Sequence, residues 1–138
     1  MRDGGNRAFY SPDTPEAVYM PGFDQFPDRV DYYSTLAHET THWTSHASRC
    51  DRQLGKRCGD QAYAMEELIA ELGSACTMAG LELELTPCAD RAAYIASWLK
   101  VLKSDKRAIF TAASQARNPR IGSANGPAVP YRWLRVAA

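Results

Sequence analysis

The sequence predicts an α+β fold that is mainly helical, with a small N-terminal β-hairpin or sheet. Two observations support this class. The first twenty residues hold two short aromatic and β-branched runs separated by a turn-forming cluster, and several stretches between residues 28 and 116 repeat apolar side chains at helical spacing. A chain of 138 residues can bury one core, so we expect one domain at residues 1–117 and an irregular, proline- and glycine-rich tail at 118–138.

The hairpin is expected to pair residues 7–10 with residues 17–20. These runs read Arg-Ala-Phe-Tyr and Ala-Val-Tyr-Met, and the cluster Ser-Pro-Asp-Thr-Pro at 11–15 favours a turn between them. Pro21 and Gly22 then end the second strand.

The first helix is expected to begin after Asp28 or Asp31, either of which can cap it, and to run to about His46. Its apolar side carries Tyr32, Leu36 and Trp43. His38 and His42 lie on a different side. A buried structural histidine would sit more naturally on the apolar stripe, so this placement favours a ligand role for both histidines.

A second helix is expected at residues 61–79, with Asp60 as its N-cap and Gly80 at its end. Its apolar stripe holds Met65, Leu68, Ile69, Leu72, Cys76 and Ala79. A different face holds Glu67, Glu71, Ser74 and Met78. Carboxylates four residues apart among small or apolar neighbours indicate a second packed surface rather than a solvated one.

Two further helices complete the expected domain. One covers residues 90–102, and the other follows a cap at Ser104 or Asp105 and reaches about Ala116. The stretch between the first two helices lacks periodicity and is expected to be a loop. The alternating Leu and Glu of residues 81–85 predict a short extended segment or turn.

Charge is unevenly distributed although the formal net charge is zero. Residues 1–90 carry 7 basic and 15 acidic side chains, whereas residues 91–138 carry 9 basic side chains and one acidic side chain. A basic half can contact nucleic acid or an acidic partner. It can also fold against the acidic half or stay solvated, and we favour this second interpretation because polyelectrolyte binding needs clustered charge.

The cysteines and the hydropathy pattern bear on the compartment. The four cysteines, Cys50, Cys58, Cys76 and Cys88, form no Cys-x-x-Cys pair. The first residues lack the apolar segment of a secretory signal, and no run of 18 apolar residues occurs. We therefore expect free thiols, a cytoplasmic protein and no membrane partner, the alternative being a Cys50–Cys58 bridge or a second metal site.

The run His38-Glu39-Thr40-Thr41-His42 predicts a metal site. Histidines four residues apart on a helix lie one turn apart on one face and present two nitrogen atoms to one point. They form half of a tetrahedral zinc shell, which leaves room for a third protein ligand and a water. Glu39 lies about 100° around the helix from His38, where it can act as a general base on that water.

The third ligand must come from elsewhere in the chain. Ser48 stands where the extended motif places a third histidine. His46 lies about 12 Å along the helix axis from His38, so we expect it to contact substrate, support the site from outside or lie on the surface. Glu67 is the expected ligand, with Glu71 accepting the free N–H of a ligating histidine. The alternative is that Glu66, Glu67 and Glu71 are all surface acids favoured by the helix dipole.

Three segments resemble the zincin-like metallopeptidase domain of ArdC-type antirestriction proteins. They read Tyr-Tyr-Ser-Thr-Leu-Ala-His-Glu-Thr-Thr-His-Trp-Thr at 32–44, Ala-Tyr-Ala-Met-Glu-Glu-Leu-Ile-Ala-Glu-Leu-Gly at 62–73 and Ala-Tyr-Ile-Ala-Ser-Trp-Leu-Lys at 93–100. The likeness runs from about Arg7 to Ala116 and implies a zincin-like fold with bound Zn²⁺. The spacing of Glu67 and Glu71 also resembles the Glu-x-x-x-Asp of thermolysin-like enzymes.

The resemblance also implies a biological setting. Members of that family occur on mobile elements, typically carry a single-stranded-DNA-binding domain before this one, and protect incoming DNA from restriction. Here we expect contact with single-stranded DNA only through a separate or missing domain. The chain departs from the family at Cys50 and Cys58, where apolar residues are expected, and in the tail after Ala116.

The leading hypothesis is a zinc-dependent metallopeptidase that acts on a peptide or protein substrate. Glu39 would take a proton from the water and deliver it to the leaving amine. Side chains that can steady the oxyanion or contact substrate are His46, Tyr63, Tyr94 and Tyr10. The alternative is a non-catalytic, zinc-containing module that docks a protein partner or single-stranded DNA through its basic half.

Overall fold

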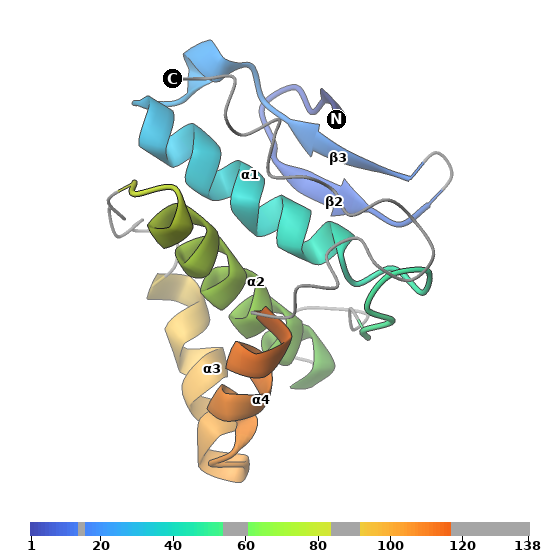
Figure 1. Ribbon diagram of the computed structural model, residues 1–138, viewed down its shortest axis with the longest axis vertical. Helices are drawn as coiled ribbons and strands as arrows, with labels where there is room; N and C mark the ends of the chain where they lie inside the picture. The colour runs from blue at the N-terminus through green and yellow to red at the C-terminus, as the bar shows by residue number, and fades with distance from the viewer. Residues whose placement is uncertain (14–15, 54–60, 84–91, 117–138) are drawn as a thin grey trace.

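The computed structural model describes residues 1–13, 16–53, 61–83 and 92–116, with the backbone alone for residues 92–97 (Figure 1). The described strands and helices are β1 (Arg2–Asp3), β2 (Phe9–Ser11), β3 (Ala17–Met20), the 3-10 helix η1 (Phe23–Gln25), α1 (Arg29–Trp43), α2 (Gln61–Gly80), α3 (Ala92–Ser104) and α4 (Ala108–Ala116). A small sheet and these helices make an α+β fold, as expected from the sequence. None of the described helices has the length and apolarity needed to cross a bilayer.

The sheet contains the expected hairpin and one strand that was not expected. β2 and β3 pair antiparallel with Tyr10 opposite Val18. The rings of Phe9 and Tyr19 stack across the pair, with centroids 4.6 Å apart. β1 adds to the other side of β3 in parallel, so the strand order is β1-β3-β2. With two residues, β1 is too short to produce a periodic signal in the sequence.

Asp28, not Asp31, caps α1. The Asp28 carboxylate accepts a hydrogen bond from the backbone N–H of Asp31 at 2.9 Å. The helix ends at Trp43, three residues before the predicted end near His46. It stops there because the following chain folds back and uses its last carbonyls, as the side chain of Arg49 donates to the Trp43 carbonyl at 2.7 Å.

Small and polar side chains form the buried side of α1, which corrects the predicted apolar stripe. Ser34, Ala37 and Thr41 are buried, whereas Tyr32, Leu36 and Trp43 are only partly buried. Figure 1 shows the reason: α1 lies between the sheet and α2. Close approach of α2 leaves no room there for large residues.

The helix α2 packs on two sides, as the two faces in its sequence predicted. On one side Leu68 and Ile69 form a core with α3 and α4, which cover the far side of α2 in Figure 1. On the other side Glu67, Ser74 and Met78 are buried. The Ser74 hydroxyl donates to the Ser34 carbonyl of α1 at 2.8 Å. This second surface positions the candidate site.

The ends of α2 differ from the prediction. Cys76 and Ala79, placed on the apolar stripe from the sequence, are exposed, whereas Met78 in the same turn is buried. Gly80 belongs to the helix, and the left-handed backbone conformation falls on Glu82 at φ 57°. The proposed cap Asp60 lies outside the described residues.

The last two helices follow the sequence with small shifts. The described part of α3 spans Ala92–Ser104, and its Val101 packs against Ala64 and Ala108. The predicted start at residue 90 lies outside the described residues. α4 begins at Ala108, later than a cap at Ser104 or Asp105 implies, although the Asp105 carboxylate still accepts the backbone N–H of Arg107 at 2.8 Å. Residues 81 and 82 form a turn, and residues 84–91 and the predicted tail at 118–138 lie outside the described part of the chain.

Candidate metal centre

The two histidines of α1 point their Nε2 atoms at one another. The Nε2 atoms of His38 and His42 lie 3.1 Å apart, and the two rings are inclined by 80°. One helical turn separates the two residues, so the helix itself sets this spacing. The arrangement directs two nitrogen lone pairs to one region of space.

Glu67 of α2 faces both histidines. Its Oε2 lies 3.5 Å from Nε2 of His38, and its Oε1 lies 3.6 Å from Nε2 of His42. Ligand atoms from the three residues all lie within 4.8 Å of one another. The three side chains expose only 16%, 12% and 10% of their surface, so a cation held between them would be partly shielded from solvent.

A carboxylate lies against the other ring nitrogen of each histidine. Oε1 of Glu71 is 3.2 Å from Nδ1 of His38, and Oε1 of Glu66 is 3.3 Å from Nδ1 of His42. Each carboxylate accepts the Nδ1–H proton and so leaves Nε2 for a metal. Two imidazoles in this tautomer and one carboxylate are a donor set that suits a divalent cation.

Burial and charge set the pKa values of two of these groups. Burial would lower the pKa of His38, but the hydrogen bonds to Glu67 and Glu71 outweigh it and raise the pKa to about 9. Burial would raise the pKa of Glu67, but the bond from His38 and the charge of His42 outweigh it, so the net shift is downward. A metal therefore competes with a proton for His38 at neutral pH.

Glu39 lies on the same helix and is buried, with 9% of its surface exposed. Burial raises the pKa of its carboxyl, against the opposing charges of His38 and His42. The backbone N–H of Tyr10 in β2 donates to this carboxylate, which ties it to the edge of the sheet. A carboxyl with a raised pKa beside a metal site has the properties of a general base.

The remaining predicted contacts are more dispersed. The described residues place His46 outside the cluster of ligand atoms, with its Nδ1 bonded to Ser48. The Tyr63 hydroxyl hydrogen bonds to Glu67. Tyr94 lies on α3, where the structure describes the backbone alone. The roles of these three residues in oxyanion or substrate contact stay predictions.

Tyr10 uses its hydroxyl elsewhere. The hydroxyl donates to Oε1 of Glu16 at 2.8 Å. Burial and the Glu16 carboxylate raise the pKa of Tyr10 to about 12, so the hydroxyl keeps its proton. Its backbone N–H, rather than its ring, is the part that reaches Glu39.

The sequence did not predict the contacts of two residues at the site, Glu66 and Arg52. Glu66 was considered only as a surface acid or a replacement third ligand, because the four-residue spacing pointed to Glu67 and Glu71. On a helix that crosses a histidine, glutamates at adjacent positions can meet the two nitrogen atoms of one ring, as Glu66 and Glu67 do at His42. The adjacent pair Glu66-Glu67 was therefore a signal in the sequence that could have predicted this contact. Arg52 lies in a loop without periodicity, and no local pattern marks it.

The family model described as zincin-like metallopeptidase matches residues 1–115 of this sequence. The chain belongs to the zincin-like metallopeptidase family. Membership in this family implies a divalent metal, which agrees with the donor set of His38, His42 and Glu67. The assignment of these three residues as ligands stays a prediction.

Relatives of this zincin-like domain are found in longer proteins. An uncharacterized protein, y4eC of Sinorhizobium fredii, is 50% identical over 117 residues, which are 85% of this chain and 38% of the relative. A DNA primase, TraC of Escherichia coli, is 43% identical over 111 residues, which are 80% of this chain and 10% of the relative. The chain thus spans well under half the length of these relatives.

Solved structures of the antirestriction protein ArdC from plasmid R388 resemble this zincin-like domain. Its Mn(II)-bound structure is 47% identical with a TM-score of 0.69, and the match covers 80% of this chain and 40% of ArdC. The metal-free structure gives a TM-score of 0.67 over similar shares, 80% and 39%. The zincin-like fold and the relation to ArdC expected from the sequence are therefore confirmed.

Proposed function

We propose that this domain is a zinc-dependent metallopeptidase. One observation carries the proposal: two imidazole Nε2 atoms and the Glu67 carboxylate face one another, with a buried carboxylate, Glu39, beside them. His38, His42 and Glu67 would hold the metal, and Zn²⁺ suits two imidazoles and one carboxylate. When bound, the metal supplies Lewis acidity to the scissile carbonyl and the attacking water.

The chain's own residues supply the proton transfers and the orientation. Glu39 takes the proton of the attacking water and later delivers it to the leaving amine. Its tie to the Tyr10 backbone keeps the carboxylate oriented beside the histidines. Glu71 accepts from Nδ1 of His38 and so orients the ring with its Nε2 toward Glu67 and His42. The substrate is a peptide or protein.

The biological setting is proposed from the relatives. ArdC is an antirestriction protein and TraC a DNA primase, so we place this domain in the protection or handling of DNA on mobile elements, in the cytoplasm. Both relatives are much longer than this chain, so we assign any contact with single-stranded DNA to another domain of a longer protein.

The test combines metal content with hydrolysis in one variant pair. Wild-type protein without a histidine tag, loaded with Zn²⁺, should cleave fluorescein-labelled casein as an unfolded protein probe. Glu39→Gln should keep the metal and lose hydrolysis by about 100-fold or more, because only the proton acceptor is removed. Equal cleavage by Glu39→Gln would show that Glu39 is not the base.

A competing proposal is a non-catalytic binding module. It is favoured by one observation: Lys100, Lys103, Lys106 and Arg107 are exposed near the junction of α3 and α4. Charge reversal at Lys100, Lys103 and Arg107 should then abolish salt-sensitive binding to single-stranded DNA or an acidic protein, while Glu39→Gln leaves it unchanged. No binding at low salt would remove the nucleic-acid form of this proposal.

A further inference from the structure

We propose that Arg52 is a positioning residue of the metal centre, which acts on His42 through Glu66. The inference rests on the proposed metal site but not on peptidase activity. Arg52 lies in the loop after α1, and Glu66 lies on α2 next to the ligand candidate Glu67. Neither Arg52 nor Glu66 belongs to the cluster of candidate ligands, which consists of His38, His42 and Glu67.

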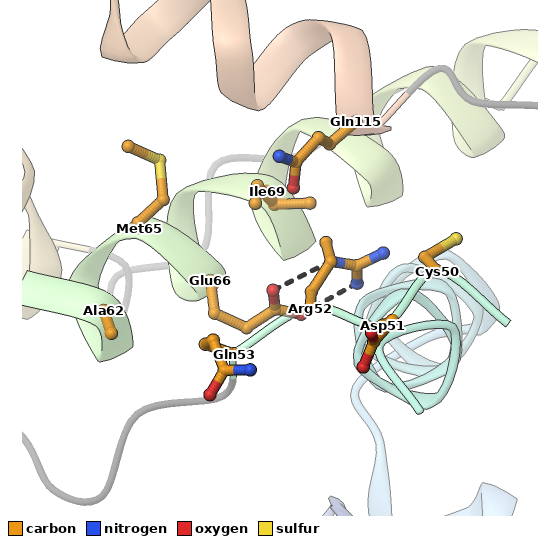
Figure 2. Close-up of a pocket in the computed structure, with 9 residues that line it drawn as sticks. All are labelled: Cys50, Asp51, Arg52, Gln53, Ala62, Met65, Glu66, Ile69 and Gln115. Atoms are coloured by element: carbon orange, nitrogen blue, oxygen red, sulfur yellow. Dashed lines mark hydrogen bonds and ion pairs between the residues drawn. The ribbon is translucent and has the colours of Figure 1, made fainter. Parts of the chain in front are cut away.

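Arg52 donates two hydrogen bonds to the carboxylate of Glu66. Its Nη2 donates to Oε1 of Glu66 at 2.8 Å, and its Nε donates to Oε2 at 2.9 Å (Figure 2). The two side chains expose 6% and 2% of their surface. Such a two-pronged, buried pair fixes the plane of the carboxylate as well as its position.

The same Oε1 atom of Glu66 faces His42. It lies 3.3 Å from Nδ1 of the ring, while Nε2 of that ring points to Glu67 and His38. A carboxylate has enough lone pairs to accept from the arginine and the histidine together. Arg52, Glu66 and His42 therefore form a chain of contacts that ends at a ligand atom.

Arg52 also holds the backbone that carries His42. Its Nη2 donates to the carbonyl of Thr41 at 2.7 Å, and its Nη1 donates to the hydroxyl of Thr44 at 2.8 Å. One guanidinium thus joins the end of α1 to the carboxylate on α2. Both the position of His42 and the orientation of its ring depend on this one side chain.

The two histidines are supported differently. The carboxylate behind His38, Glu71, exposes 15% of its side chain, whereas Glu66 behind His42 exposes 2%. A carboxylate buried as deeply as Glu66 needs a charged partner, since removing one member of a buried pair leaves an uncompensated charge. Arg52 is that partner. Its replacement should therefore disturb His42 more than replacement of an exposed arginine would.

The matched control is Arg49, three positions earlier in the same loop. Its Nε donates to the Trp43 carbonyl at 2.7 Å, and its guanidinium lies 3.8 Å from the Trp43 ring centre. It pairs with Glu16 instead of Glu66. Replacing it removes an arginine that anchors the loop without touching the carboxylate behind His42.

The experiment measures the dissociation constants of Zn²⁺ and Co²⁺ by competition with a chromophoric chelator. Arg52→Gln and Glu66→Gln should each weaken binding by about 10- to 100-fold, the range for partners that orient a metal-ligating histidine. The double variant should bind metal no more weakly than the weaker-binding single variant, because each single variant already breaks the Arg52–Glu66 contact. The Co²⁺ absorption bands should shift in both, and Arg49→Gln should match wild type.

Each outcome bears on the inference. Wild-type affinity and an unchanged Co²⁺ spectrum in folded Arg52→Gln would overturn it, as would equal losses in Arg49→Gln. Should Arg52→Gln not fold by circular dichroism, Arg52→Lys decides, because lysine keeps the charge but not the two-pronged geometry: intermediate affinity supports the proposal and wild-type affinity overturns it. Wild type that binds neither ion would overturn the metal site itself, and the positioning role with it.

Discussion

Gly73 of α2 lies directly against Thr41 of α1. A Cβ atom at Gly73 would fall 2.6 Å from both Cγ2 and Oγ1 of Thr41, far inside van der Waals contact. Thr41 cannot turn away without loss, because its hydroxyl donates to the Ala37 carbonyl at 2.8 Å. This contact sets how closely the helices approach beside His42 and Glu67, and therefore whether their ligand atoms meet.

Gly73→Ala should destabilise the protein by about 1–3 kcal/mol, the usual range for overpacking a filled interior. It should also weaken metal binding, since the helices must separate. Denaturant unfolding and metal titration check both effects. Thr41→Ala removes the two clashing atoms, so the double variant should recover part of the loss; stability equal to wild type in Gly73→Ala alone would contradict the steric argument.

Glu67→Ala should abolish stoichiometric metal binding, because two imidazoles alone leave the cation without its anionic protein ligand. Elemental analysis of protein without a histidine tag measures this directly. The exposed Glu82→Ala serves as the carboxylate control and should keep wild-type metal content. Full metal content in Glu67→Ala would move the third ligand to Glu66, Glu71 or His46.

Tyr63→Phe should weaken metal affinity several-fold, because the Tyr63 hydroxyl hydrogen bonds to Glu67 and helps to hold its carboxylate. The dissociation constant for Zn²⁺ is the readout, with casein cleavage measured in parallel on fully loaded protein. A lower kcat with an unchanged dissociation constant would instead place Tyr63 in contact with the substrate.

Stability at acid pH should depend on Glu16. Burial raises the pKa of its carboxyl, but hydrogen bonds from Arg49 and Tyr10 outweigh it, so the folded-state pKa lies below the unfolded value of 4.5. The ionised form is therefore favoured by folding, and its contribution is present above pH 4.5 and lost as the pH falls through the folded-state pKa.

Glu16→Gln should consequently flatten the dependence of the unfolding free energy on pH in the window below pH 4.5. Arg49→Gln should flatten it in the same window, and the double variant should add little, because the two side chains form one pair. Urea unfolding at several pH values tests this. An identical acid slope in wild type and Glu16→Gln would rule out a pH-dependent role for this pair.

Local patterns in the sequence were sufficient for much of the fold. The hairpin of β2 and β3, the start of α1 after an aspartate, and the two-sided packing of α2 all follow from residues within a few positions of one another. The four-residue spacing of His38 and His42 belongs to the same class, since a single helix turn brings them together. The zincin-like resemblance rests on these same local runs.

Packing between α1 and α2 decided which side chains meet at the site and which residues of α1 are buried. Which glutamate meets which ring nitrogen depends on how the helices cross, and that crossing is set by the contact of Gly73 with Thr41. The same close approach buries small residues on α1 instead of the predicted apolar stripe.

Arg52 is the clearest example of a site residue that local sequence patterns do not predict. Its partner Glu66 lies fourteen positions along the chain, and only the folding of the loop over the end of α1 brings the pair together. The sequence by itself determined the helices and the histidine pair, because those depend on neighbouring residues. The tertiary structure decided which glutamate meets which ring nitrogen and brought Arg52 to Glu66, because these side chains come from separate elements whose approach no local pattern encodes.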